Sequence, residues 1–232
     1  MTLFSGAAAE FWMRWVHYIF GILWIGHLYY FNFSQMAFMG EADAATKSVV
    51  LQKLSPRTRF WFRWGAMFTF LSGWGMIGHK MGAAGSTIAT SAWGTIILSG
   101  GILGTLMFLN VWLLIWPNNK IMIENAIKTA KGEAAIPGVA DLAARASVAS
   151  RTNTLFSIPM LFFMGAASHL PLVLSPEKSL VPYWCTYAII VGLLQLNAMK
   201  GKMGPMQKLG GVIHFGVLLS LALYFAMEFL AG

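Results

Sequence analysis

Charged residues are scarce in this chain of 232 amino acids: they make up 10% of it, whereas 57% of the residues are hydrophobic. A soluble globular domain carries about a quarter charged residues, so this chain has too little polar surface to cover a water-facing globule. Long unbroken apolar runs, in place of short alternating ones, favour membrane-spanning helices over a membrane β-barrel. The composition therefore predicts a protein whose surface faces lipid.

Cysteine is nearly absent. The single cysteine, Cys185, excludes an internal disulfide, a cysteine-rich metal site and a cysteine-ligated iron–sulfur cluster within these residues. The CxxCH motif of covalently attached haem c, the Walker loop, GxSxG and HExxH are all missing. No Asp or Glu lies in the middle of an apolar run. A carboxylate-based hydrolase or an ion-coupled transporter is therefore disfavoured.

Six apolar stretches each approach the roughly 20-residue length that a spanning helix needs. They cover about 11–33, 60–79, 89–116, 153–172, 181–199 and 209–230. We therefore predict an all-α, polytopic membrane protein, with a single transmembrane domain over 1–232 and a bundle of about six helices. The connection at about 117–152 is predicted to be amphipathic and cytoplasmic, to lie on the bilayer surface, and to follow a helix stop at Pro117.

Basic residues lie almost entirely on one side of the predicted bundle. Of the 16 Lys and Arg residues, only Arg14, Lys80 and Lys178 fall outside the first–second, third–fourth and fifth–sixth connections and their flanks. The positive-inside rule places these connections in the cytoplasm and both termini outside, in the periplasm of a bacterial inner membrane. The net charge of +8 then reflects attraction to anionic headgroups, so the lipid bilayer is an expected partner and nucleic acid is not.

All five histidines lie in or at the ends of the apolar stretches: His17, His27, His79, His169 and His214. An ionisable side chain is costly in a membrane, which makes each a functional candidate. The helical rise places His27 and His214 at an inner level and the other three at an outer level. Paired imidazoles from different helices hold haem b in membrane cytochromes. We therefore predict at least one bis-histidine haem site, either His27 with His214 or His17 with His79 or His169.

Two other interpretations of these side chains stay open. His79 and His169 with Met76 and Met81 would supply soft thioether and imidazole ligands for copper, and any one histidine could simply form hydrogen bonds between helices. Amide side chains also gather toward the cytoplasmic ends of the stretches. They either satisfy one another or line a cavity for a quinone or a small polar substrate. They are Asn32, Gln35, Asn110, Asn153, Gln195 and Asn197.

Four segments carry a family resemblance: WVHYIFGILWIGHLYYFNF at 15–33, FRWGAMFTFLSG at 62–73, NVWLLIWPNNK at 110–120 and SRTNTLFSIPMLFFM at 150–164. They resemble the membrane domain of the bacterial membrane-bound urate oxidase (urate hydroxylase) family, over about 11–170 and more weakly beyond. His17 matches the family's first-span histidine, whereas His27 stands where many relatives carry another residue. The resemblance implies a membrane-bound oxidoreductase, which in fused members passes electrons to a C-terminal cytochrome c domain.

The leading hypothesis is an integral membrane redox protein that binds haem b and transfers electrons to a partner. Because CxxCH is missing, we expect the acceptor to be a separate cytochrome c-like protein or a quinone. The chain would be a urate-oxidase-like oxidoreductase, or a subunit of one alongside other membrane subunits. The alternatives are a cofactor-free channel or permease for a small polar solute, and an accessory or assembly subunit of a larger membrane complex. Whether the chain is itself an enzyme, and on which substrate, stays open.

Overall fold

The structure, a computed structural model, describes residues 8–170 and 172–232. Within these ranges the chain is helical and contains no strand, which confirms the all-α prediction. The elements η3, η4 and η6 are π-helical, and η5 and η7 are 3₁₀ turns. In chain order the elements are α1 (Ala9–Tyr29), η3 (Tyr30–Gln35), α2 (Met36–Glu41), α3 (Ala44–Val49), η4 (Val50–Leu54), α4 (Ser55–Ala84), η5 (Ser86–Thr90), α5 (Ala92–Leu109), η6 (Asn110–Ile115), α6 (Trp116–Ala130), α7 (Val139–His169), α8 (Val181–Lys200), η7 (Gly204–Gln207) and α9 (Leu209–Ala231).

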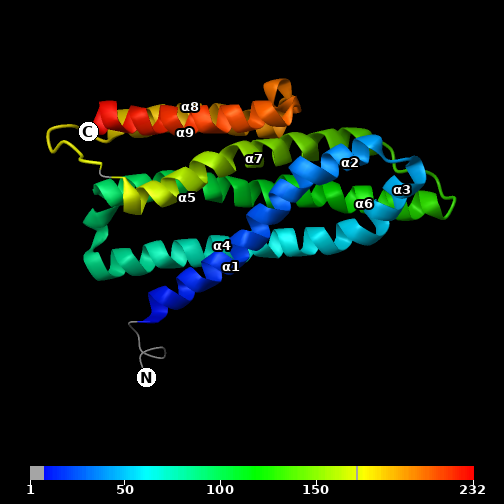
Figure 1. Ribbon diagram of the computed structural model, residues 1–232, viewed down its shortest axis with the longest axis horizontal. Helices are drawn as coiled ribbons and strands as arrows, with labels where there is room; N and C mark the ends of the chain where they lie inside the picture. The colour runs from blue at the N-terminus through cyan, green and yellow to red at the C-terminus, as the bar shows by residue number, and fades with distance from the viewer. Residues whose placement is uncertain (1–7, 171) are drawn as a thin grey trace.

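Four of the six predicted apolar stretches lie entirely within one continuous helical segment, whereas the stretch at 89–116 begins in η5, before α5, and α7 ends at His169, before the end of the stretch at 153–172. Among the described residues, three segments are long and apolar enough to cross a membrane: Ala92–Ala130, Val181–Lys200 and Leu209–Ala231. The first of these joins α5, η6 and α6 into 39 residues. At 1.5 Å per residue it is about 58 Å long, well beyond the roughly 30 Å of a hydrocarbon core. The bundle is elongated, with most of its long helices running along one axis and α1 crossing them obliquely (Figure 1).

Local chemistry sets several helix ends. Asp43 accepts a hydrogen bond from the backbone N–H of Thr46 at 2.8 Å and caps α3, and Ser91 caps α5 in the same way through the N–H of Gly94. These bonds satisfy backbone donors that have no partner inside the helix. Before α7, Gly138 has a φ of 76°, which a residue with a Cβ rarely adopts.

The prediction of a helix stop at Pro117 is wrong. The chain passes from η6 into α6 without a break, and Pro117 occupies the first turn of α6. Proline is tolerated inside a long helix where a local π-helical adjustment satisfies the neighbouring backbone groups, and here the N–H of Trp116 donates to the carbonyl oxygen of Val111, five residues earlier. Residues 139–152 belong to α7, which packs against α6. The 117–152 segment is therefore a helical hairpin that prolongs the bundle (Figure 1); its cytoplasmic location stays a prediction.

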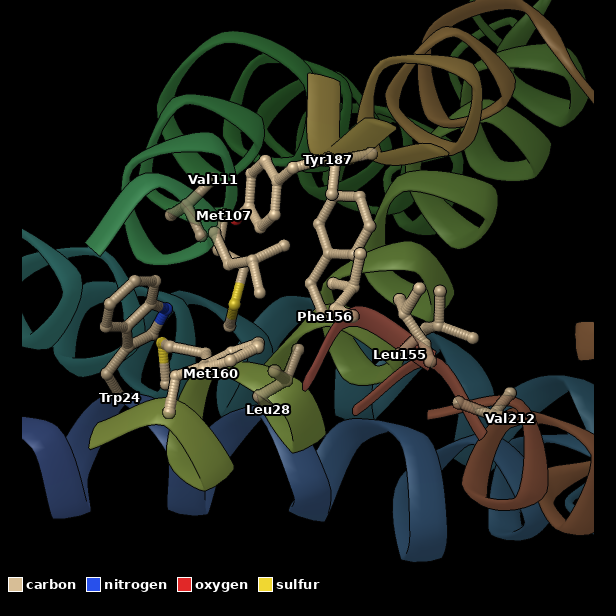
Figure 2. Close-up of a cluster of buried hydrophobic side chains, with 14 of the residues drawn as sticks. Trp24, Leu28, Met107, Val111, Leu155, Phe156, Met160, Tyr187 and Val212 are labelled. Atoms are coloured by element: carbon tan, nitrogen blue, oxygen red, sulfur yellow. The ribbon is translucent and has the colours of Figure 1, made fainter. Parts of the chain in front are cut away.

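The α5 and α7 helices form the centre of the bundle. On one side lies α1, which crosses and packs against α4, and on the other side lie α8 and α9 (Figure 1). Side chains from all these layers meet in one hydrophobic core, which includes Trp24 of α1, Met107 of α5, Phe156 of α7, Tyr187 of α8 and Val212 of α9 (Figure 2). Large apolar side chains also cover the outward helix faces, as expected of a surface that meets lipid.

Candidate functional site

His17 lies half-buried on the side of α1 that faces α4. Its Nδ1 is 3.0 Å from the carbonyl oxygen of Thr69 and 3.2 Å from the hydroxyl of Ser72. A carbonyl oxygen can only accept a hydrogen bond, so Nδ1 carries the proton and Nε2 keeps its lone pair. A Cβ added at Gly73 would lie 3.0 Å from the ring carbon Cε1, so the imidazole rests directly on the backbone of α4. The ring is thus fixed, with Nε2 available as a ligand.

His27, ten residues further along α1, repeats this arrangement. Its Nδ1 is 2.6 Å from the carbonyl oxygen of Leu23, one turn earlier, and its ring centroid lies 6.0 Å from that of Phe31. Nε2 again keeps its lone pair. Histidines that bind metals commonly donate the other ring N–H to a carbonyl oxygen in this way. Both histidines of α1 therefore have the tautomer that a haem iron requires.

The other three predicted ligands, His79, His169 and His214, are exposed. His79 is on α4, six residues beyond Gly73 and therefore about 9 Å further along the helix from the level of His17. His169 ends α7, and the ends of α4 and α7 lie at the same end of the bundle (Figure 1). His214 is on α9, which packs against α7 and α8. In Figure 1, α7 lies between α9 and α1, the helices that carry His214 and His27, and the pairing of these two histidines stays a prediction.

His17 and His27 would each be suited to hold a haem iron, because each has a ring fixed through Nδ1 and a free Nε2. The described residues show no second histidine bonded beside either one. Across 8–170 and 172–232 there is also no group of three or more His, Cys, Asp or Glu side chains that could hold a metal ion. The pairing of ligands, and the copper set around His79 and His169, stay predictions.

Three of the predicted amides bond to one another in the core. Asn110 Nδ2 donates to Asn153 Oδ1 at 2.9 Å and to Gln195 Oε1 at 3.0 Å, and Gln195 Nε2 donates back to Asn110 Oδ1 at 2.7 Å. Asn153 Nδ2 donates to the carbonyl oxygen of Met107. This network connects η6, α7 and α8. It confirms for these three amides the interpretation that they satisfy each other.

Gln35 instead lines a cavity of about 180 Å³. Its wall comes from all three π-helical elements, through Phe31 and Gln35 of η3, Leu51 of η4 and Ile115 of η6, and from α2, α4, α6 and α7. Arg59 and Asn119 add polar groups to the wall. The lining residues lie at or just beyond the inner ends of the predicted spans, so we expect the cavity at the cytoplasmic membrane boundary. It contains no histidine and is far too small for a porphyrin.

The cavity wall is positively charged. The Arg59 guanidinium lies 3.7 Å above the ring centroid of Phe31, and its Nε is buried without a hydrogen-bond partner. Burial lowers the pKa of Arg59 to about 10, so the side chain is still a cation at neutral pH. Arg151 contacts Met36, another lining residue: the Nη2 of Arg151 lies 3.0 Å from the Sδ of Met36. The Nε and Nη1 of Arg151 are buried without hydrogen-bond partners. No Asp or Glu belongs to the lining.

A family model described as urate oxidase N-terminal matches residues 80–202, just over half of the chain. The chain belongs to the urate oxidase N-terminal family. The match confirms the resemblance seen in the sequence and extends it beyond residue 170, through α8. No curated protein and no solved structure matches the chain.

The urate oxidase N-terminal match covers only part of the candidate sites. It includes His169, the amide network and the α6 and α7 walls of the cavity, whereas His17, His27 and Arg59 precede it. Sequence reasoning missed Arg59 as a site residue and counted it only among the basic residues that set orientation. One feature of the sequence could have identified Arg59 as a candidate: α4 contains no acidic residue that could pair with it.

Proposed function

We propose that this member of the urate oxidase N-terminal family is a redox protein of the bacterial inner membrane. It spans the membrane six times with both termini in the periplasm, binds haem b, and transfers electrons from a urate-like substrate to a cytochrome c-like acceptor outside. The observation that carries the proposal is the fixed tautomer of His17, whose Nδ1 is bonded to the Thr69 carbonyl so that Nε2 is free. Family membership supplies the substrate class.

The two α1 histidines suggest where haem would be held. His17 supplies one ligand at the outer level, with His79 or His169 as the second, and His27 supplies one at the inner level. Their separation of ten residues corresponds to about 15 Å along the helix. Haem bound there would carry one electron at a time between the two faces of the membrane. Hydroxylation of urate by water releases two electrons and two protons, so two molecules of a one-electron acceptor such as cytochrome c are reduced in each turnover.

Residues of this chain would do the remaining work. Thr69 holds the His17 ring in the orientation and tautomer needed for ligation. The apolar core around Trp24 and Phe156 excludes water between the two levels. The permease alternative loses support, because the Asn110, Asn153 and Gln195 amides bond to one another.

The proposal is tested with membranes that contain the chain, by measuring urate-dependent reduction of added cytochrome c. We expect reduction with the wild type and its loss in His17→Ala. The matched control is Tyr18→Ala, which removes an exposed side chain next to His17 on α1 and should leave the rate unchanged. Full activity in His17→Ala would contradict the assignment, and no reduction by the wild type would favour an accessory subunit.

A further inference from the structure

Arg59 is a cation without a counterion at the wall of the inner cavity. Among the described residues it forms no ion pair, and its Nε is buried with no acceptor. A buried charge is costly unless it is paired and hydrogen-bonded. The guanidinium face is already occupied by the ring of Phe31, which itself packs edge-on against Phe62. Arg59 as a whole is only partly buried, but its Nε–H has no acceptor within the protein, and an anion bound in the cavity would supply one.

The same wall also contains a hydrogen-bond acceptor that lacks a donor. Gln35 is 8% exposed, and its Oε1 is buried without a donor. Asn119 is 7% exposed and uses its Nδ2 to donate to the carbonyl oxygen of Ile115 at 2.7 Å. A ligand that matches both Arg59 and Gln35 needs a negatively charged acceptor and an N–H donor in one small molecule. Simple inorganic anions such as chloride have no N–H.

The backbone around the cavity is unusual as well. The elements η3, η4 and η6 are π-helical, and each contributes to the lining. Such turns make up well under 1% of residues in proteins and occur often at functional sites. Three of them converge on this one cavity. Its volume of about 180 Å³ compares with about 150 Å³ in an engineered cavity that binds benzene, so a compact ring system fits.

We propose that this cavity is a binding site for a small planar anion that also carries ring N–H groups, with Arg59 pairing with its negative charge and Gln35 accepting from an N–H. The urate monoanion belongs to this class. Its role as the substrate at this site rests on the function proposed above, whereas the binding itself does not. The site would lie one helical turn from His27 of α1, through Phe31.

The test is equilibrium dialysis of the purified, detergent-solubilised full chain with urate. We expect Arg59→Gln to weaken binding by about 10- to 100-fold, because a charge-assisted hydrogen bond is lost. The matched control is Arg57→Gln on the same helix. Arg57 is exposed, donates to the carbonyl oxygen of Lys53 and does not line the cavity. Equal affinities of wild type and Arg59→Gln would overturn the proposal.

A second variant keeps the test decisive if Arg59→Gln does not fold. Gln35→Glu places a carboxylate in the wall beside Arg59, so it should raise the melting temperature of the ligand-free protein and abolish urate binding. Retained urate binding by this variant would overturn the site. Binding is measured without electron transfer, so a chain that lacks haem but binds urate refutes the proposed function and leaves this site intact.

Competing ligands define the chemistry of the site. Hypoxanthine, a neutral ring of similar shape, should bind at least tenfold more weakly than urate. Such a difference would show that the site recognises the negative charge of the ligand. Inorganic phosphate should not displace urate. Displacement by phosphate, or by short-chain phosphatidylglycerol, at concentrations where urate binds would overturn the planar-ring assignment and identify a phosphate or lipid-headgroup site.

Discussion

The crossing of α1 and α4 positions both His17 and Phe31, and Gly65 makes this crossing close. A Cβ added at Gly65 would lie 3.0 Å from the backbone nitrogen of Trp24 and 3.3 Å from the carbonyl oxygen of Phe20. These are backbone atoms, which cannot rotate away as a side chain does. The Gly65→Ala substitution must therefore push α1 away from α4 by a few tenths of an ångström, and overpacking of this kind costs about 1–3 kcal/mol.

Gly78 provides a matched control on the same helix, because a Cβ there would meet nothing within 4 Å. Alanine is favoured over glycine in a helix by about 1 kcal/mol, and this gain applies to both variants. The free energy of unfolding of Gly65→Ala should therefore be about 1–3 kcal/mol lower than that of Gly78→Ala. Unfolding of the purified protein by titration with a denaturing detergent measures the difference. Equal stabilities of the two variants would refute the close α1–α4 crossing.

Two further predictions concern topology and the amide network. Glu177 and Glu133 are both exposed, and the loop that contains Glu177 is predicted to lie outside the membrane, whereas the turn that contains Glu133 is predicted to lie inside. In a Cys185→Ser background, a membrane-impermeant maleimide should therefore label Glu177→Cys but not Glu133→Cys in spheroplasts. The reverse pattern would contradict the predicted orientation. Asn110→Leu should lower the free energy of unfolding by about 1–3 kcal/mol, since it leaves two amides short of partners, and an unchanged stability in the same titration would show that the network contributes nothing.

Composition and apolar length predicted the helices correctly, because burial of apolar runs in lipid depends on local sequence alone. The same reasoning placed a helix stop at Pro117 and was wrong, because a proline ends a helix only where the surrounding backbone cannot adjust to it. Here the helix changes to π-helical bonding before Pro117, with the N–H of Trp116 bonded to the carbonyl oxygen of Val111, and continues into α6. No pattern in the sequence around Pro117 indicates that the helix changes from α-helical to π-helical hydrogen bonding there.

The sites were only partly predictable. Helical rise gives the depth of a histidine, but the neighbouring helix is set by packing between distant segments. His27 and His214 share a predicted level, yet α7 separates their helices (Figure 1). The inner cavity shows the same limit. Gln35 was among the candidate lining residues, whereas Arg59 became one only because folding brings η3, α4 and α6 together.

The most direct test of the account is the visible spectrum of the purified protein, oxidised and then reduced with dithionite, together with a pyridine haemochrome assay. We predict sharp α and β bands on reduction and haem b in near-stoichiometric amount, with a clear loss of haem in His17→Ala. A colourless protein from cells supplied with haem would contradict the central claim.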